Sequence, residues 1–325
     1  METSYNIVIA TDNNYAPHAA ICIKSFILNN QDAPPTHFHI LDNNLNNESK
    51  EWLELSLRKD DSISYYSISN IRNLLKVPVP DRISITTYAR MFIGSILPDS
   101  FDKVLYLDCD IVINANLKDL FEIQIEPEIY IVGVLDAFLT NNAKTEIGIP
   151  SDSPYINAGV LLVSLNHWRK NNLENRFIEF LLNKNGDVKY DDQGILNAVC
   201  HGHKKIIHPK YNVYSTIYSH SYKLIKKHNN PIYSKQEYKD AKTYPTIIHF
   251  TSGVVNRPWV EHCVHPLKSK YITLKKSMPF SDLPLLKDSR NYRERINSWM
   301  LRNTCIFIYN FSLLSTKKWT GLKIK

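Results

Sequence analysis

The sequence predicts an α/β fold in which a mostly parallel sheet carries helices on both faces. Short apolar segments rich in β-branched residues alternate along the chain with longer segments whose apolar residues lie three and four positions apart. Strands that alternate with helices are typical of parallel sheets, since a parallel connection needs a crossover of helical length. Hydrophobic residues make up 43% of the 325 residues, enough for the core of one main domain.

Seven segments have the composition of buried strands and stop at polar or turn residues. They are residues 5–11, 37–41, 62–66, 103–107, 129–134, 158–163 and 246–250. Helical spacing predicts helices at residues 19–28, 47–57, 85–97, 172–183 and 194–199. From about residue 268 the pattern becomes basic, aromatic and helical, so we expect an α/β domain at residues 1–267 and a separate C-terminal segment at residues 268–325.

Two carboxylates, Asp108 and Asp110, directly follow the strand at residues 103–107. Residues two apart on a strand point to the same side, so we expect both to converge at the strand's carboxyl end, where open α/β sheets bind ligands. Converging carboxylates repel each other unless a cation lies between them. A few oxygen ligands suit Mg²⁺ or Mn²⁺ that completes its shell with substrate phosphates. His249 ends a later strand, where a lone histidine is more often structural than a ligand, but it is also a reasonable third ligand.

Composition argues against several classes of protein. The five cysteines are scattered, odd in number and form no Cys-x-x-Cys pair, which speaks against a disulfide framework or a zinc site and fits a reducing compartment. The chain has nine glycines and neither of the Gly-rich phosphate-loop motifs of other nucleotide folds. It shows no secretory signal and no apolar run long enough to cross a membrane, so we expect a cytosolic protein or one attached to a cytosolic face.

The net charge of +7 lies in residues 287–325, the last part of the C-terminal segment, because residues 1–286 are neutral overall. Residues 287–325 combine this charge with aromatic residues such as Tyr292, Trp299 and Trp319. A basic residue near an anionic leaflet gains about 1 kcal/mol, and aromatic rings favour the membrane interface. We therefore expect this segment to lie on a membrane surface; a basic helix folded against the domain, or contacting a partner, is the alternative. The neutral remainder of the chain argues against a nucleic-acid partner.

Polar residues at other strand and helix ends have both a structural and a functional interpretation. Asp12 and Asn14 follow the first strand, where they could bind the base or ribose of a nucleotide or simply cap the next helix. Arg90 lies early in a helix and could bind a phosphate or carboxylate, although an exposed helical arginine is usually just solvated. Asp191 or Asp192 could be the N-cap of the helix that follows them.

Six segments, taken in order, closely resemble the motifs of one family. They are Ile-Val-Ile-Ala-Thr-Asp-Asn-Asn-Tyr at residues 7–15, Ile-Ser-Ile-Thr-Thr-Tyr-Ala-Arg at 83–90, Lys-Val-Leu-Tyr-Leu-Asp-Cys-Asp at 103–110, Asn-Ala-Gly-Val-Leu-Leu at 157–162, Asp-Asp-Gln-Gly-Ile-Leu-Asn at 191–197 and a His…Gly…Arg-Pro-Trp segment at 249–259. From about Tyr5 to Phe280 the chain resembles the retaining glycosyltransferases of family 8, the group that contains bacterial lipopolysaccharide and lipooligosaccharide galactosyl- and glucosyltransferases. The resemblance implies a glycosyltransferase A-type fold, with a Rossmann-like mixed sheet flanked by helices.

The resemblance also implies a divalent metal, Mn²⁺ or Mg²⁺, and a donor substrate, UDP-galactose or UDP-glucose. Matched position by position, the implied metal ligands are Asp108, Asp110 and His249. The implied donor-binding residues are Ala10, Asp12 and Asn14 at the uridine, Asp108, Gly253 and Arg257 at the phosphates, and Arg90, Asn157 and Ala158 at the sugar. The implied catalytic residues, also at the sugar, are Gln193, Asp192 and Asp136.

The expected activity is metal-dependent, retaining transfer of a hexose, galactose or glucose, to a saccharide or lipid-linked oligosaccharide acceptor in lipopolysaccharide or lipooligosaccharide biosynthesis. Residues 1–267 would be the nucleotide-sugar-binding catalytic domain, and residues 268–325 would hold the protein at the cytoplasmic face of the bacterial inner membrane. Retention could arise from a covalent intermediate or from front-face attack by the acceptor hydroxyl. Gln193 favours front-face attack if it faces the anomeric carbon, because glutamine is a poor nucleophile.

The chain departs from the family's pattern in two places. Arg257 stands where the family usually has lysine and lies two residues farther from His249, and Arg82 stands where a histidine often precedes the second motif. Arginine keeps the charge that a phosphate needs. Two other functions stay open: a phosphatase of the haloacid dehalogenase type, with Asp108 as nucleophile, and a non-catalytic membrane adaptor with a transferase fold.

Overall fold

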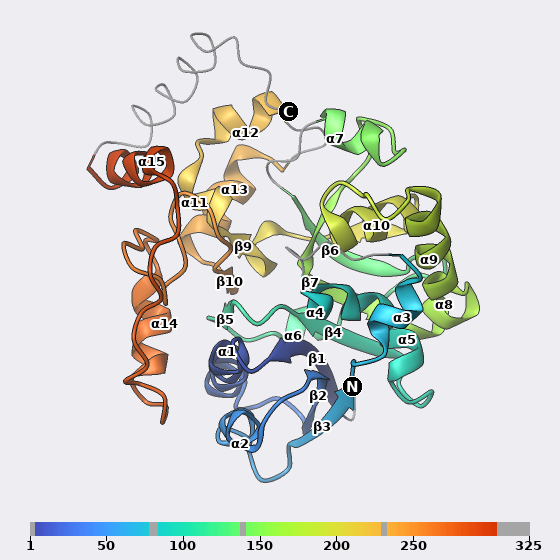
Figure 1. The fold of residues 1–325 in the computed structure, drawn as a ribbon, viewed down its shortest axis with the longest axis horizontal. Coiled ribbons are helices and arrows are strands. Elements are labelled where there is room, and N and C mark those ends of the chain that lie inside the picture. Colours follow the sequence, from blue (N-terminus) through green and yellow to red (C-terminus); the bar gives the residue numbers. More distant parts are fainter. Residues whose placement is uncertain (1–3, 78–83, 137–140, 229–232, 304–325) are drawn as a thin grey trace.

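A computed structural model of the protein describes residues 4–77, 84–136, 141–228 and 233–303 (Figure 1). Its main sheet has seven strands in the order β3-β2-β1-β4-β7-β6-β8. They are β1 (Tyr5–Asp12), β2 (Thr36–Asn43), β3 (Ser62–Ser67), β4 (Lys103–Leu107), β6 (Ile131–Leu135), β7 (Ile156–Ser164) and β8 (Lys204–Ile206). β7 runs antiparallel to both neighbours, β4 and β6, and the other pairings are parallel. The sheet is therefore mixed, as the family resemblance implied.

A second, three-stranded sheet stands beside the first. It has the order β5-β10-β9, with β5 (Ile111–Ile113), β9 (Val213–Tyr214) and β10 (Ile247–His249). β10 pairs antiparallel with β5 and parallel with β9. Because β5 directly follows the strand β4 and its turn, this small sheet brings the end of β10 to the carboxyl edge of the main sheet.

Seventeen helices and helical turns are found among the described residues. They are α1 (Ala16–Asn29), α2 (Asn47–Glu54), α3 (Ile71–Leu75), α4 (Ile85–Tyr88), η1 (Ala89–Phe92), α5 (Ile93–Ile96), α6 (Lys118–Phe121), α7 (Asn141–Glu146), α8 (Leu165–Lys170), α9 (Leu173–Asn183), α10 (Asp191–Val199), η2 (Pro209–Tyr211), α11 (Ser215–Ser219), α12 (Tyr222–His228), α13 (Lys235–Thr243), α14 (Lys268–Lys275) and α15 (Tyr292–Asn303). The helices cover both faces of the main sheet, as predicted (Figure 1).

The apolar strands bury both of their faces, which explains why they read as continuous apolar runs. In β1, Ile7 and Ile9 belong to the core beneath α1 and the small sheet. Val8 and Ala10, which point the other way, belong to the core beneath α9 and α10. The strand β1 thus separates two hydrophobic cores and contributes to both, and its polar last residues lie at the carboxyl edge of the sheet.

The helical segment predicted at residues 85–97 is confirmed over residues 85–96, but as three short consecutive pieces, α4, η1 and α5. All four residues of η1 are buried, including Arg90, so this segment has no solvent face at its centre. The apolar residues of the three pieces therefore form one continuous pattern in the sequence, which predicts a single long helix. Gly94 lies in the tight approach of α5 to α8, where an added Cβ would stand 2.6 Å from Trp168 Cδ1.

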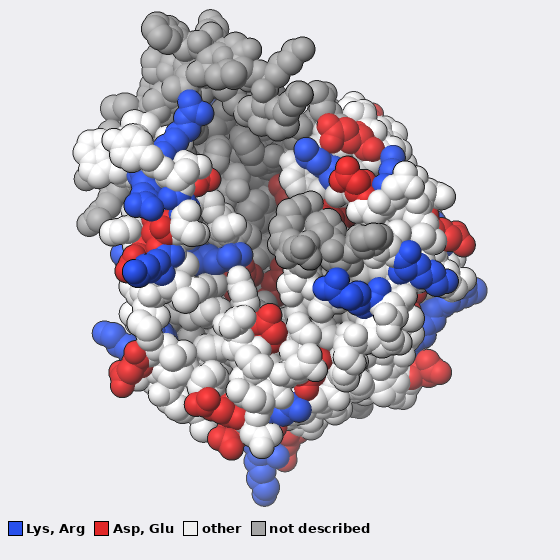
Figure 2. Space-filling view, viewed as in Figure 1, with Lys and Arg blue, Asp and Glu red and all other residues white. Residues whose placement is uncertain are grey.

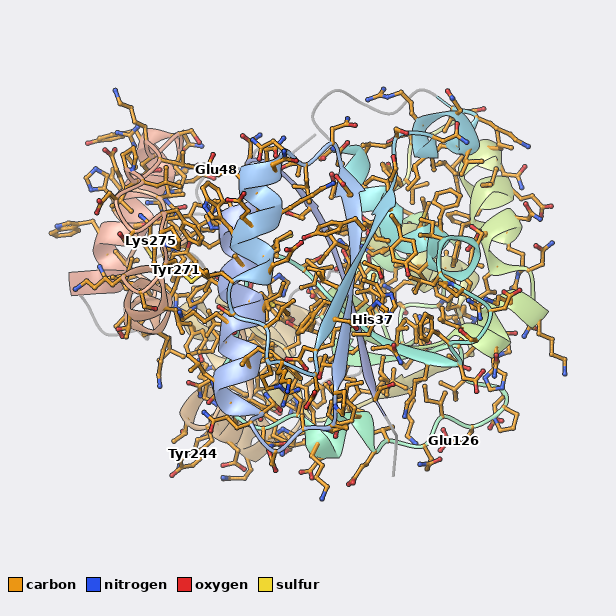
Figure 3. The ribbon with its side chains drawn as sticks, turned by 90° about the horizontal axis from the view of Figure 1, so that it is seen from below. His37, Glu48, Glu126, Tyr244, Tyr271 and Lys275 are labelled. Carbon is orange, nitrogen blue, oxygen red and sulfur yellow. The ribbon has the colours of Figure 1, made fainter. Side chains whose placement is uncertain are left out.

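The first part of the C-terminal segment packs on the α/β domain. Tyr271 of α14 lies beside α1 and is hydrogen-bonded to His18 Nδ1 at 2.7 Å (Figure 3). Burial lowers the pKa of His18 to about 3, so this imidazole is neutral, and its ring stacks on Trp259 at 3.8 Å. Phe280 is also buried in this core. The functional boundary at residue 267 stays a prediction.

Farther along, α15 presents aromatic residues to solvent. Tyr292 is 80% exposed and Trp299 is 63% exposed. Among the helices that the structure describes, none is both long and apolar enough to cross a bilayer. Arg82 and residues 304–325, with Trp319, lie outside the described residues.

Candidate active site

Asp108 and Asp110 lie in the turn between β4 and β5, so the expected cause of their convergence, alternation along one strand, is wrong. The backbone N–H of Asp108 donates to the Gly159 carbonyl (2.9 Å), which extends the pairing of β4 with β7. The carbonyl of Asp110 accepts from the Phe250 N–H (2.7 Å) and so begins the small sheet. The two carboxylates come together because the turn passes from one sheet to the other.

The strand β10 brings His249 close to the two aspartates, because His249 pairs across the small sheet with Ile111 of β5, the residue after Asp110. His249 Nε2 lies 3.0 Å from Asp110 Oδ1 and 3.8 Å from Asp108 Oδ2. Burial alone would lower the pKa of His249, but the two carboxylates outweigh it and raise this pKa. Burial would raise the pKa of Asp110, but His249 and Arg257 lower it to about 2. The site is thus built from opposite charges held at close range.

These three residues fit a divalent metal. One ligand atom from each lies within 4.8 Å of the others, and no other such group of histidine, cysteine or acidic residues occurs in the part of the chain that the structure describes. Neighbouring ligands of an octahedral ion with bonds of about 2.1 Å stand about 3.0 Å apart, the separation of His249 Nε2 and Asp110 Oδ1. Gly159 leaves the necessary space, because an added Cβ would overlap His249 Cε1 and stand 2.8 Å from Asp108 Oδ2.

Arg90 is buried, with 7% of its surface exposed, and joins three parts of the site. Its Nη2 lies 2.9 Å from Asp108 Oδ1, its Nε lies 2.9 Å from Asp192 Oδ2, and its Nη1 donates to the Ala158 carbonyl. The Nε–H points at the Thr87 carbonyl (3.2 Å), so Asp192 Oδ2 is in ionic contact but accepts no hydrogen bond among the described residues. Burial raises the pKa of Asp192 to about 6 despite the neighbouring guanidinium. Arg90 is therefore no solvated surface arginine.

The helix α10 presents Gln193 to the start of β7. Gln193 Oε1 accepts from the Ala158 N–H (3.0 Å), and its Nε2 donates to Asp136 Oδ2 (3.1 Å) and to the Tyr155 hydroxyl (3.4 Å). The N-cap of α10 is Tyr190, in the left-handed region at φ 62°. The proposed N-cap role of an aspartate here is therefore wrong, and Asp192 is free to pair with Arg90.

Asn157 and His249 are joined through Asn212, which precedes β9. Asn212 Nδ2 donates to Asn157 Oδ1 (2.8 Å), and Asn212 Oδ1 lies 2.9 Å from His249 Nδ1. Asn157 Oδ1 also accepts from the Gly159 N–H (3.1 Å). The metal ligands and the residues expected at the sugar thus form one connected network.

A cleft of about 220 Å³ opens beside the two aspartates. It is lined by the ends of β1 and β4, the start of α4 and the loop after β10, through residues Ala10, Thr11, Asp12, Tyr15, Ser84, Thr86, Thr87, Arg90, Tyr106, Asp108, Cys109, Asp110 and Arg257. Figure 2 shows a hollow near the middle of the molecular face, with acidic side chains at its bottom. Arg257 Nη2 lies 3.5 Å from Asp110 Oδ2, which places a positive charge next to the aspartates.

The structure divides the expected site residues into groups. Those that line the cleft are Ala10, Asp12, Arg90, Asp108, Asp110 and Arg257. Those in the hydrogen-bonded network behind it are Asp136, Asn157, Ala158, Asp192, Gln193 and His249. Asn14 and Gly253 are exposed and belong to neither group among the described residues. Gly253 has a φ of 125°, in the region that favours glycine.

Several residues of this site were not among those expected from the sequence, and three of them show why. Tyr106 lines the cleft and donates to Asp108 Oδ1 (3.1 Å), and the two-residue period of the strand could have found it. Tyr15 also lines the cleft, and it lay inside the first motif. Asn212 carries no signal in the sequence, because one asparagine in a polar loop is unremarkable.

Comparisons with known proteins show the family to which the chain belongs. The model of the family described as Glycosyl transferase family 8 matches residues 6–263. A putative glycosyltransferase of Haemophilus influenzae is 34% identical over 213 residues, which cover 64% of this chain and 62% of that protein. A lipopolysaccharide 1,2-glucosyltransferase of Escherichia coli is 27% identical over 296 residues, 90% of this chain and 84% of that protein.

Among solved structures, the chain is similar to the galactosyltransferase LgtC in complex with donor and acceptor sugar analogues. The two share 26% sequence identity and superpose with a TM-score of 0.70, over 84% of this chain and 96% of that one. The likeness extends to the glycosyltransferase A-type arrangement of the mixed sheet and its helices. The match to the Haemophilus influenzae relative, by contrast, spans less than two thirds of that protein's length.

Proposed function

Because this chain belongs to glycosyl transferase family 8, we propose that it is a metal-dependent, retaining hexosyltransferase that uses a UDP-sugar. The sugar is galactose or glucose, since the relatives include a galactosyltransferase and a glucosyltransferase. The acceptor is a saccharide or lipid-linked oligosaccharide of lipopolysaccharide biosynthesis. The observation that carries the proposal is the Asp108, Asp110 and His249 group at the edge of a cleft that also holds Arg257.

Asp108, Asp110 and His249 would hold Mn²⁺ or Mg²⁺. Bound there, the ion would neutralise negative charge on the donor's diphosphate. Arg257 stands 3.5 Å from Asp110 Oδ2, with its guanidinium 6.0 Å from the Tyr15 ring centre. It would add a second positive charge at the phosphates, which supports the arginine as a working substitute for the family's usual lysine.

The sugar would lie against the network of Gln193, Asp136, Asn157 and Asp192. Gln193 has both ends of its amide engaged, by the Ala158 N–H and by Asp136. An amide held in this way is a poor nucleophile, so we favour front-face attack. The acceptor hydroxyl oxygen bonds to the anomeric carbon as the bond to the diphosphate breaks, and a diphosphate oxygen takes the hydroxyl proton. Asp192, held 2.9 Å from Arg90 Nε, would stand behind the reactive face of the sugar.

The C-terminal segment would hold the enzyme at the cytoplasmic face of the inner membrane, near a lipid-linked acceptor. Support comes from α15, where the exposed rings of Tyr292 and Trp299 stand on a helix that also carries Arg293 and Arg295. Aromatic and basic side chains together favour an anionic membrane interface.

The phosphatase alternative fits the geometry less well. It needs an aspartate nucleophile on an early strand, whereas Asp108 follows the fourth strand of the chain. Arg90 also lies 2.9 Å from Asp108 Oδ1, in a network that a phosphatase would leave without a role. The adaptor alternative predicts no turnover and is addressed by the same experiment as the proposal.

The test is UDP release from UDP-galactose, UDP-glucose and UDP-N-acetylglucosamine, with and without Mn²⁺. Asp110→Asn should reduce turnover roughly 100-fold or more, because a bound metal contributes several kcal/mol to the transition state. Asp119→Asn is the matched control, since Asp119 is an exposed aspartate on α6. Turnover with galactose or glucose donors that needs the metal and Asp110 supports the proposal; no turnover or binding with any donor refutes it.

A further inference from the structure

We propose that Asn212 is a positioning residue that fixes two things at once: the nitrogen that His249 turns toward the metal, and the amide atom that Asn157 turns toward the sugar. This inference rests on the proposed function and adds a residue to it. Asn212 lies outside the six motifs and does not line the cleft. It reaches the site only through its two side-chain partners, Asn157 and His249.

The direction of each hydrogen bond follows from one backbone group. The Gly159 N–H can only donate, so the atom of Asn157 that faces it at 3.1 Å must be the oxygen. The same oxygen faces Asn212 at 2.8 Å, so Asn212 must present its NH₂ group there. The other end of the Asn212 amide, its oxygen, then faces His249 Nδ1 at 2.9 Å. His249 Nδ1 must therefore carry a proton.

This assignment decides which His249 nitrogen is available to a metal. With the proton on Nδ1, the lone pair of a neutral imidazole is on Nε2. Nε2 is the atom that lies 3.0 Å from Asp110 Oδ1 and 3.8 Å from Asp108 Oδ2. A metal-ligating histidine usually donates its other N–H to a fixed acceptor, and here that acceptor is the Asn212 oxygen.

The same assignment decides what Asn157 offers to a ligand. Its oxygen is occupied by the Gly159 N–H and by Asn212. Its amide nitrogen therefore faces the opposite side, as a donor to a sugar hydroxyl oxygen. Replacing the Asn212 donor with an acceptor would repel the Asn157 oxygen, which the Gly159 N–H still holds, and would therefore displace the Asn157 amide from its position at the sugar.

The burial of these residues favours a single orientation for the amides of Asn157 and Asn212 and for the imidazole of His249. Asn212 and His249 are 0% and 3% exposed, and Asn157 is 9% exposed, so little water can replace a missing partner. The backbone of Asn212 is also held, because its N–H donates to the Pro209 carbonyl (3.1 Å). The next two residues form β9, whose Tyr214 pairs with His249. Asn212 thus directly precedes the strand that pairs with the strand of His249.

Two substitutions separate the two roles. Asn212→Asp keeps an oxygen that accepts from His249 but loses the donor to Asn157. We expect Mn²⁺ affinity within about threefold of wild type, or tighter, and a UDP-sugar turnover reduced at least tenfold. Asn212→Leu removes both hydrogen bonds, and it should also weaken Mn²⁺ binding about 10- to 100-fold.

The readout is Mn²⁺ affinity of the full-length protein without nucleotide, measured from the EPR signal of the free ion, together with UDP release. Asn114→Leu is the matched control: Asn114 lies just after β5 in the same small sheet region, and its amide donates to the Pro245 carbonyl (2.8 Å). This control should leave Mn²⁺ affinity unchanged. If Asn212→Leu does not fold, Asn212→Ser is used, because a serine hydroxyl is too short to reach both partners.

The outcomes distinguish this inference from the proposed function. If wild type binds Mn²⁺ and turns over a UDP-sugar, while the Asn212→Leu or Asn212→Ser variant matches it in both measurements, the inference is wrong and the function stands. Equal loss of Mn²⁺ affinity in Asn212→Asp and Asn212→Leu would also overturn it, since an acceptor alone would then not position His249. A wild-type protein with neither property refutes the function and the inference together.

Discussion

Arg90 offers the sharpest test of how the site is held together, because it neutralises a buried carboxylate, Asp192, and a partly exposed one, Asp108, at the edge of the cleft. Its guanidinium lies 2.9 Å from Asp108 Oδ1 and 2.9 Å from Asp192 Oδ2, and the side chains of Arg90 and Asp192 are 8% and 6% exposed. Burial alone would lower the pKa of Arg90, but the two carboxylates outweigh it and raise this pKa. Arg90→Met keeps most of the apolar volume and removes the charge.

The expected loss of stability is large. Removing one partner of a buried ion pair costs about 3–5 kcal/mol, because the remaining charge is left without compensation. Unfolding entropy is about 2.1 cal/mol/K per residue, so for 325 residues 1 kcal/mol corresponds to about 1.5 °C in Tm. Arg90→Met should therefore lower the Tm of the metal-free protein by about 4–7 °C at pH 8, as measured by calorimetry in a chelating buffer.

The loss should depend on pH in a definite direction. Burial already raises the pKa of Asp192 to about 6, and without Arg90 it rises further. A carboxyl whose pKa is higher in the folded state than in the unfolded state takes up a proton on folding, so its cost appears as pH rises through the folded pKa. The Tm difference between variant and wild type should therefore shrink from pH 8 to pH 5, where Asp192 is largely neutral in both proteins.

Arg169→Met is the matched control. Arg169 is also partly buried, but its guanidinium donates to the carbonyls of Gly94, Leu97, Pro98 and Phe101. Its loss should cost stability to a similar extent at both pH values, because no buried acid is left behind. The reasoning would be refuted if Arg90→Met lowered the Tm by less than 1 °C at pH 8, or by the same amount at pH 5.

Two further predictions concern close packing around the site. Gly159→Ala would place a Cβ against His249 and should cost about 1–3 kcal/mol and at least tenfold in Mn²⁺ affinity. Gly133→Ala on β6 is its control, since the nearest atom there is 3.2 Å away at the end of a flexible side chain; equal metal affinity in the two variants would contradict the argument. Tyr271→Phe leaves its buried histidine partner on α1 unpaired and should lower the Tm by about 1.5–4 °C, from a loss of about 1–3 kcal/mol. Tyr218→Phe is the control and should change the Tm little, because the buried Tyr218 hydroxyl has no partner among the described residues. An equal drop in Tm in both variants would contradict the argument, because the loss of a hydroxyl and not of its hydrogen bond would then explain the Tyr271→Phe result.

Much of the main sheet could be predicted because its central strands are buried on both faces and are therefore apolar throughout. The segments expected at residues 5–11 and 103–107 correspond to β1 (Tyr5–Asp12) and β4 (Lys103–Leu107). The strands β8 and β9, with three and two residues, were missed because no period can be read from so few positions. The direction of β7 is likewise absent from composition, since a buried antiparallel strand has the same apolar residues as a parallel one.

A site residue could be predicted from the sequence when its neighbours in the sequence indicate its role, and could not when the role depends on contacts with distant residues. Asp108 and Asp110 are visible because two acids end an apolar run. Arg90 could be named from its chemistry and from the family resemblance, but its burial between two acids is a tertiary property that the residue types do not show. Asp192 was open to a wrong interpretation as an N-cap, since the left-handed backbone at Tyr190 that starts α10 leaves no mark in the residue types.

Asn212 shows why the last layer of such a site is hidden from sequence. An asparagine side chain has a donor and an acceptor in one plane, so its role depends wholly on which atoms face it. Here those atoms belong to residues of β7 and β10. The direction of donation in the whole series of hydrogen bonds is set by the backbone N–H of Gly159. A backbone N–H cannot change its direction of donation, so it can anchor the amides of Asn157 and Asn212 and the imidazole of His249 in one arrangement. The proposed site presents a lone pair of His249 to a metal and an N–H of Asn157 to a sugar, and both orientations follow from the Gly159 N–H. The hydrogen bonds that link these residues exist only when both sheets are in place.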